Sequence, residues 1–194
     1  MKVIFLDIDG VMNSELFYTN RYQKRWLRPI TYYYLIRSKI KYVFNGFKNK
    51  GVSLIDYKIS KKHKEFKYLF ERLKKETEAL KWKWLSEFCE KENCKICISS
   101  VWRNHFNNYD EWNKALMLLG FNDKVFVGTT GKRRTERGEE IKEWLDNNVV
   151  EKYAIIDDDN DMLPEQLSNF FVTDGYCGLS PSVLYRIGRH FNKK

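Results

Sequence analysis

Short apolar runs alternate with longer segments of helical periodicity along most of the chain. The first expected strand, residues 2–8, contains the continuous apolar run of residues 3–6, which is typical of a strand buried on both faces of a parallel sheet. Further strands are expected at residues 95–99, 124–127, 153–156 and 170–173. Helices are expected at residues 65–90, 109–119 and 138–147, and in a C-terminal segment that opens at Ser180-Pro181. Strands that alternate with helices predict an α/β fold with a Rossmann-like, doubly wound parallel sheet.

The segment after the first strand breaks this alternation. We expect a core domain of residues 1–13 and 78–194, with a largely helical insertion, or cap, at residues 14–77. Charge sets the same part of the chain apart. Residues 13–83 contain 19 Lys and Arg and 6 Asp and Glu, a net charge of +13, whereas the whole chain carries +9. The remainder is therefore mildly acidic, with a net charge of −4.

The basic segment is also rich in Tyr, Phe and Trp, and three interpretations of it stay open. Basic side chains neutralise phosphates and aromatic faces stack on bases, so the segment could bind nucleic acid, with Lys24, Arg25 and Arg28 as candidate contacts. It could equally be an amphipathic cap that turns its aromatic residues inward and keeps its lysines in water. A third interpretation places it on an anionic membrane surface.

The pattern disfavours secretion, a membrane span and a zinc site. Asp7 and Asp9 interrupt the first apolar run too early for a signal sequence. Three cations interrupt the apolar tract at residues 30–47, which falls short of the roughly 20 apolar residues that a span needs. We therefore expect a cytoplasmic protein. Cys94 and Cys97 form a lone C-x-x-C with no second pair or nearby His, so buried reduced thiols are the better interpretation.

Candidate chemistry lies at the ends of two apolar strands. Asp7-Ile8-Asp9-Gly10-Val11 follows the first strand, and Gly10 allows a turn that can bring both carboxylates to one site. An ordinary surface turn is the alternative, because Asp and Gly both favour turns. The strand at residues 153–156 leads into residues 157–161, where four carboxylates repel one another unless a cation binds or water solvates them. Oxygen ligands of this kind favour Mg²⁺ over zinc or copper.

Weaker signals lie between these two clusters. The second strand ends in Ser99 and Ser100, and Arg137 stands at the start of a helix. Trp102 and Arg103 follow the second strand. They are either a core Trp with a surface Arg or, in the case of Arg103, a cation near the mouth of the site that contacts a phosphate.

Together and in this order, the segments resemble the four motifs of haloacid dehalogenase (HAD)-type phosphatases. The motifs correspond to Asp-x-Asp-Gly at residues 7–10, a strand ending in Ser99, the cation Arg137 and the acidic segment at residues 157–161. The resemblance covers residues 1–13 and about 79–185. A narrower resemblance, to the branch that includes RNA-repair phosphatase domains, is carried by Ser99-Ser100-Val101-Trp102-Arg103, Arg137-Gly138-Glu139-Glu140-Ile141, Ile156-Asp157-Asp158, and Thr173-Asp174 with Gly178-Leu179-Ser180. The paired Asp157-Asp158 also resembles the 3′-phosphatase domain of phage-type polynucleotide kinase-phosphatases.

The resemblance implies catalytic roles for individual residues. Asp7 would be the nucleophile, and Asp9 would be the general acid and then the general base. Ser99, with Ser100 as the alternative, would bind a phosphoryl oxygen. Arg137 would balance charge and orient Asp7 or the phosphate.

The resemblance also implies a Mg²⁺ site. The ion would be held by Asp7, by the backbone carbonyl of Asp9 and by the carboxylate of Asp158. The family usually has Gly where Asp157 stands, so Asp157 is the alternative ligand. Lys is commoner than Arg in the third motif, and Lys132 could contact the phosphate in place of the Arg.

The expected function is that of a magnesium-dependent phosphomonoester hydrolase that forms an aspartyl-phosphate. Its expected substrates are nucleic-acid ends that carry a 3′-phosphate, or nucleotides, with RNA and DNA as candidate partners. One alternative is a small-metabolite phosphatase whose insertion is a lid. Another is a nucleic-acid- or membrane-binding module that no longer turns over. Leaving group and oligomeric state do not follow from the sequence.

Overall fold

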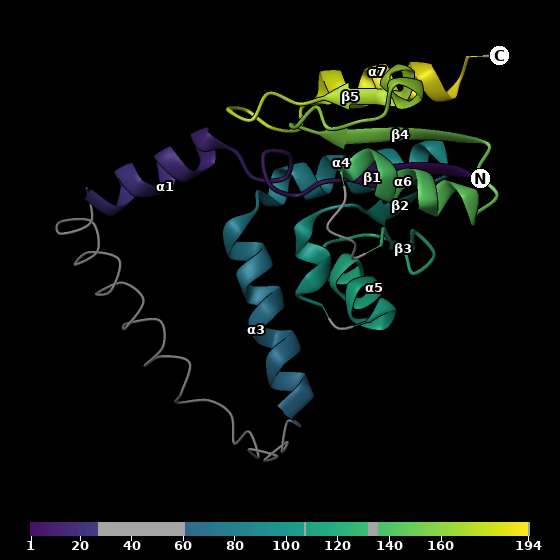
Figure 1. Cartoon of the computed structure of the whole chain (residues 1–194). Helices are drawn as coiled ribbons and strands as arrows, with labels where there is room; N and C mark the ends of the chain where they lie inside the picture. The colour runs from purple at the N-terminus through teal and green to yellow at the C-terminus, as the bar shows by residue number, and fades with distance from the viewer. Residues whose placement is uncertain (27–60, 107, 132–135, 194) are drawn as a thin grey trace.

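The computed structural model describes residues 1–26, 61–106, 108–131 and 136–193. The described part is built on a parallel sheet of five strands in the order β3-β2-β1-β4-β5. The strands are β1 (Lys2–Leu6), β2 (Cys94–Ile98), β3 (Phe126–Thr129), β4 (Lys152–Asp157) and β5 (Phe170–Val172). Figure 1 shows the central strands running from the side of the N-terminus towards α1 (Glu15–Trp26), so their carboxyl ends meet at one edge.

The centre of the sheet is the continuous apolar run of the sequence. In β1, Leu6 is in register with Ile98 of β2 and Ile156 of β4, and all three side chains are fully buried. This is the two-sided burial that a central strand of a parallel sheet requires. The parallel strands and the doubly wound strand order agree with the α/β fold that the sequence predicts.

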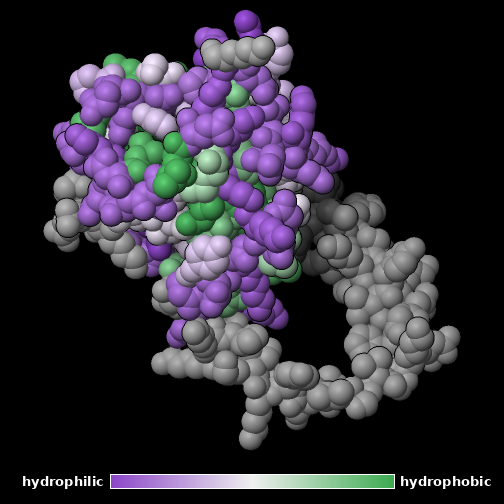
Figure 2. All heavy atoms as spheres, turned by 90° about the vertical axis from the view of Figure 1, so that its right-hand side faces the viewer, coloured by the Kyte–Doolittle hydropathy of each residue, from purple (hydrophilic) through white to green (hydrophobic). Residues whose placement is uncertain are grey.

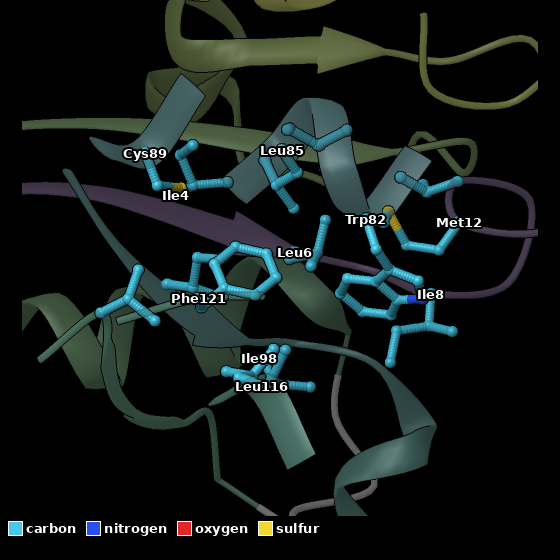
Figure 3. Packing of buried hydrophobic residues seen from close by; sticks show 14 of the residues in the cluster. Ile4, Leu6, Ile8, Met12, Trp82, Leu85, Cys89, Ile98, Leu116 and Phe121 are labelled. Carbon is cyan, nitrogen blue, oxygen red and sulfur yellow. The ribbon is translucent and has the colours of Figure 1, made fainter. Parts of the chain in front are cut away.

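Helices cover both faces of the sheet. The larger hydrophobic cluster packs one face against α4 (Ala79–Glu92), α5 (Tyr109–Leu118) and α7 (Pro181–Phe191), and the smaller cluster packs the other face against α6 (Arg137–Asp146). Figure 3 shows side chains of β1, α4 and α5 meeting within the larger cluster. Cys94 belongs to the larger cluster and Cys97 to the smaller one, because an odd spacing on a strand points side chains to opposite faces.

The predicted single helix at residues 65–90 is two helices, so this expectation is wrong in one respect. The chain forms α3 (Lys61–Glu76) and α4, with a break at Thr77 and Glu78. The Thr77 hydroxyl donates to the Leu73 carbonyl and accepts from Nε1 of Trp82, both at 2.7 Å. Glu78 has extended backbone dihedrals, and its N–H donates to the Met12 carbonyl at 2.9 Å. Contacts with the first motif loop therefore outweigh helical propensity at this point.

The start of the segment expected to form the insertion, residues 14–77, is held by residues outside it. The N–H groups of Glu15 and Leu16 donate to the carbonyls of Gly175 and Tyr176. The Ser14 hydroxyl donates to Oε1 of Glu78 at 2.9 Å. The side chains of α3 that face inward, Phe66, Phe70 and Leu73, belong to the larger hydrophobic cluster.

Two short 3-10 helices complete the described elements, η1 (Val101–Asn104) and η2 (Pro164–Asn169). Among the residues described, no helix has both the length and the apolar composition that crossing a membrane demands. Figure 2 views the end of the molecule where β1 begins, and shows a mostly hydrophilic surface around a small apolar patch. Cys89, Cys94 and Cys97 are buried free thiols, and Cys177 is exposed.

Candidate active site

The turn after β1 places Asp7 at the carboxyl edge of the sheet. The N–H of Asp7 continues the ladder to β4 by donating to the Ile156 carbonyl at 3.0 Å, and the residue is 4% exposed. The chain then turns sharply at Gly10, which has φ +66°. A Cβ on Gly10 would lie 2.0 Å from Oδ2 of Asp158, so only glycine leaves room for that carboxylate.

Three carboxylates gather at this turn. Asp7, Asp157 and Asp158 each offer an oxygen, and these oxygens lie within 4.8 Å of one another. Asp7 and Asp157 are buried, whereas Asp158 is exposed and lies over Gly10. The folded chain thus brings together the first and fourth sequence motifs, which are about 150 residues apart in the sequence.

Arg137 faces two of these carboxylates from the amino-terminal turn of α6. Its Nη2 lies 3.2 Å from Oδ1 of Asp7, and its Nε lies 3.4 Å from Oδ2 of Asp157. The backbone N–H of Arg137 donates to Oδ2 of Asp161 at 3.2 Å, which fixes the start of the helix against the acidic segment. One guanidinium therefore bridges the first and fourth motifs.

Burial makes the ionised form of these carboxylates costly. Desolvation, followed by the charge of Asp157, raises the pKa of Asp7 to about 7, although Arg137 and a hydrogen bond from Ser100 oppose the rise. Desolvation also raises the pKa of Asp157 to about 6. When both are ionised, the buried carboxylates of Asp7 and Asp157 face a single cation, Arg137, so negative charge is in excess. A divalent cation that takes oxygen ligands would balance this charge.

The two serines after β2 lie on the same edge. The Ser100 hydroxyl is a hydrogen-bond partner of Asp7 and lowers the pKa of that carboxyl, and it also accepts from the N–H of Trp102. The Ser99 hydroxyl is fully buried and has no hydrogen-bond partner among the described residues. Ser99 thus has a donor available for a ligand, while Ser100 is already engaged with Asp7.

Arg103 does not reach the mouth of the site. Its guanidinium is buried, donates to the carbonyls of Ser99 and Ser100 at 2.8 and 3.0 Å, and pairs with Glu140 at 2.7 Å. Burial lowers the pKa of Arg103, and the Glu140 carboxylate opposes that change. The guanidinium of Arg103 therefore stabilises the turn that carries the two serines. Its donors face Ser99, Ser100 and Glu140, and not the mouth of the site where a phosphate contact was considered.

The indole of Trp102 is a site contact that sequence reasoning missed. Nε1 of Trp102 donates to both carboxylate oxygens of Asp9, each at 3.1 Å, and Asn13 donates to Oδ1 of Asp9 at 2.9 Å. The Asp9 carboxylate is therefore held outside the group formed by Asp7, Asp157 and Asp158. The only sequence signal was the position of Trp102 just after the second motif.

The remaining candidates fall where the structure does not describe their side chains. Lys24 and Arg25 lie in α1, but their side chains are outside the described ones, and Arg28 and Lys132 lie outside the described residues.

An open hollow of about 480 Å³ adjoins the carboxylates. It is lined by Asp9, Gly10, Asn13, Ser14, Glu15, Tyr18, Asp158, Asp174, Gly175 and Tyr176.

Comparison with known proteins assigns the chain to a family. Residues 3–183 match the family described as the HAD domain in Swiss Army Knife RNA repair proteins. The chain belongs to this family. The narrower resemblance seen in the sequence is confirmed, and so is the α/β fold. Comparisons with curated proteins and with solved structures gave no match.

Membership of the HAD family indicates a phosphatase-type hydrolase that acts on a phosphorylated substrate. HAD proteins generally use Mg²⁺, and the three clustered carboxylates suit such an ion. The matched range, residues 3–183, includes residues 14–77.

The variant Arg137→Met tests whether Arg137 stabilises this HAD domain through its charge or through packing. Without the guanidinium, the metal-free protein should lose about 3 kcal/mol of stability near pH 8, where Asp7 and Asp157 are ionised. The loss should shrink near pH 5, because protons then neutralise both carboxyls, whose pKa values are about 7 and 6. Thermal denaturation at the two pH values measures the difference. An equal loss at both would mean that Arg137 acts through packing and not through charge.

Proposed function

We propose that the protein is a magnesium-dependent phosphomonoester hydrolase that works through an aspartyl-phosphate on Asp7. The observation that carries the proposal is the position of Asp7, at the carboxyl end of β1, paired with Arg137 and clustered with Asp157 and Asp158. This arrangement gives a carboxylate nucleophile, a cation that orients it and oxygen ligands for a divalent ion at one point.

The proposed reaction has two steps. An oxygen of Asp7 attacks phosphorus, and the bond from phosphorus to the leaving oxygen breaks. Asp9 gives its proton to that leaving oxygen and becomes a carboxylate. Asp9 then takes a proton from water as the water attacks phosphorus, which releases inorganic phosphate and restores Asp7. Ser99 and Arg137 donate to the phosphoryl oxygens throughout.

The carboxylates of Asp7 and Asp158, with Asp157 as the alternative, would hold the Mg²⁺. When bound, the ion supplies positive charge next to the phosphoryl group and so reduces its repulsion of the nucleophile. Asp157 is already paired with Arg137, whereas Asp158 is exposed, so we assign Asp158 as the direct ligand and Asp157 as its support. The backbone carbonyl of Asp9 would complete the set on the protein side.

We propose nucleic-acid ends with a 3′-phosphate, or nucleotides, as the substrates. The family description, which places HAD domains in RNA repair proteins, supports this class. The net charge of +13 over residues 13–83 supports it as well, since it suits a polyanion that crosses the insertion. We accordingly treat residues 14–77 as the cap and residues 1–13 and 78–194 as the core, in a protein that works in the cytoplasm.

A second candidate is a phosphatase of small metabolites. The hollow beside the carboxylates favours it, because Asp9, Glu15, Asp158 and Asp174 make its lining acidic. A neutral leaving group, such as a sugar, would suit this lining better than a second phosphate would.

The test of substrate class is one assay panel with Mg²⁺: 3′-phosphorylated and 5′-phosphorylated oligonucleotides, mononucleotides and sugar phosphates. If the insertion binds polynucleotide, reversing charge at Lys24, Arg25 and Arg28 should raise KM for the oligonucleotide about 10-fold at low salt. The KM for a small aryl phosphate should stay within about twofold, since that ester contacts only the motif residues.

A matched triple reversal at Lys91, Lys142 and Arg189, which are exposed on the core, controls for net charge alone. Equal losses from the two triple variants would remove the insertion from substrate binding. A preference of the unaltered protein for sugar phosphates over every nucleic-acid substrate would favour the metabolite phosphatase.

A further inference from the structure

Asp9 is exposed, yet its carboxylate is fixed from two sides. Nε1 of Trp102 lies 3.1 Å from both oxygens, and Nδ2 of Asn13 lies 2.9 Å from Oδ1. The Asn13 side chain is itself held, because its Oδ1 accepts from the Gly10 N–H at 2.7 Å. An exposed carboxylate without such donors would be free to change rotamer. Here the orientation is set before any substrate arrives.

The Trp102 indole, on η1, is in turn held between Arg72 of α3 and His105. Trp102 is 3% exposed, and its ring faces the guanidinium of Arg72, whose Cζ lies 5.1 Å from the ring centroid. Nε of Arg72 is held by Glu76 at 3.0 Å, one turn further along α3. His105 packs its ring edge-on to the indole at 5.2 Å. A residue of the insertion thus touches the group that touches Asp9.

We propose that Trp102 is a positioning residue for Asp9, and that Arg72 on α3 seats the indole for this role. The inference rests on the proposed function, since it requires Asp9 to be the general acid. It assigns to the insertion a part in the chemistry that is separate from substrate binding. Because the indole N–H lies 3.1 Å from both oxygens of Asp9, it fixes the direction of the carboxyl group, which is what a positioning residue has to do.

The two oxygens of Asp9 differ in their contacts. Oδ1 accepts from both Asn13 and Trp102, whereas Oδ2 accepts from Trp102 alone among the described residues. The Trp102 N–H reaches both oxygens, so it fixes the plane of the carboxyl group, and Asn13 fixes which oxygen lies on its own side.

The variant Trp102→Phe tests the role, because it removes the N–H and keeps an aromatic ring over which Arg72 can lie. Trp112→Phe is the matched control: Trp112 is also buried, but its Nε1 has no hydrogen-bond partner among the described residues. For each variant, kcat/KM is measured with an alkyl phosphate and with a nitrophenyl phosphate. An alkoxide leaves poorly and needs the acid, whereas a nitrophenolate leaves without it.

We expect Trp102→Phe to lower kcat/KM for the alkyl ester about 10-fold and for the nitrophenyl ester by no more than about twofold. Trp112→Phe should change neither value by more than about twofold. In an Asp9→Asn background, Trp102→Phe should have almost no further effect on the alkyl ester, because the group that it positions is already absent. A loss of equal size on both esters, or an undiminished loss in the Asp9→Asn background, would show that Trp102 only packs.

Two further measurements keep the outcome decisive. If Trp102→Phe fails to fold, as judged by thermal denaturation, Arg72→Met takes its place and should lower kcat/KM for the alkyl ester by about threefold with the nitrophenyl ester unchanged. No change from Arg72→Met would remove the insertion from this role. Failure of the proposed function itself looks different, since Asp9→Asn would then keep the wild-type rate on the alkyl ester.

Discussion

Replacing Asp7 by Asn is expected to reduce kcat by roughly 10⁴-fold or more, since removal of a covalent nucleophile costs losses of this order or greater. An amide is a poor nucleophile, and it is a weaker ligand for Mg²⁺ than a carboxylate. The fold should survive. Burial and the charge of Asp157 raise the pKa of Asp7 to about 7, which means that the ionised carboxylate destabilises the folded protein. Replacing it by a neutral amide removes that destabilising charge.

The measurement is single-turnover and steady-state hydrolysis of a nitrophenyl phosphate, with the melting temperature of the metal-free protein as the folding control. Asp146→Asn, at the exposed end of α6, makes the same chemical change away from the site and should leave kcat within about twofold. We expect the metal-free Asp7→Asn protein to melt at the same temperature as the wild type or higher. Retention of the wild-type rate by Asp7→Asn would exclude the covalent mechanism.

Chelation of divalent cations should abolish turnover, with activity restored by Mg²⁺ or Mn²⁺. The three clustered carboxylates are the reason, because they are ordered for a hard cation and repel one another without it. Loss of the ion should cost at least about 10³-fold in kcat, since the charge of the phosphoryl group would then be faced by Arg137 and the serines alone. Full activity after exhaustive chelation would contradict the assignment of the site.

Binding of the ion should depend on pH in a defined window. The pKa values of Asp7 and Asp157 are raised in the folded protein, to about 7 and about 6, above the 3.8 of an unperturbed Asp. Their contribution to stability is therefore full below about pH 4 and is lost as the pH rises through these values. Mg²⁺ competes with the same protons, so its affinity should increase between about pH 5 and pH 8.

The corresponding measurement is the rise in melting temperature caused by Mg²⁺, recorded at several pH values. The rise should be small near pH 5 and large near pH 8. Asp158→Asn should reduce it, because that carboxylate is the proposed direct ligand. A rise that does not vary with pH would place the ion away from Asp7 and Asp157.

Local patterns in the sequence are sufficient for the fold class and for the four motifs. The short continuous apolar run of residues 3–6 favours a strand with neighbours on both sides, and β1 does lie between β2 and β4. Asp7 follows β1, Asp157 ends β4 and Arg137 starts α6, and the carboxyl ends of parallel strands meet at one edge. The alternation of elements therefore predicts that the two carboxylates share an edge of the sheet, whereas the adjacency of β1 and β4 comes from the structure.

Side-chain contacts cannot be predicted in this way, because one sequence pattern is compatible with many side-chain directions. Nothing local shows that the Trp102 indole points at Asp9, that the Arg103 guanidinium turns inward to Glu140, or that Thr77 ends a helix. Each of these depends on which groups are left unpaired once the elements have packed: a buried guanidinium must find a carboxylate, and a buried indole N–H an acceptor. The sequence by itself determined the sheet, the position of the site and the residue types that carry the chemistry. Only the tertiary structure decided which of those residues lie in the carboxylate cluster and which hold the others in place, because hydrogen-bond satisfaction is a property of the packed chain and not of any segment.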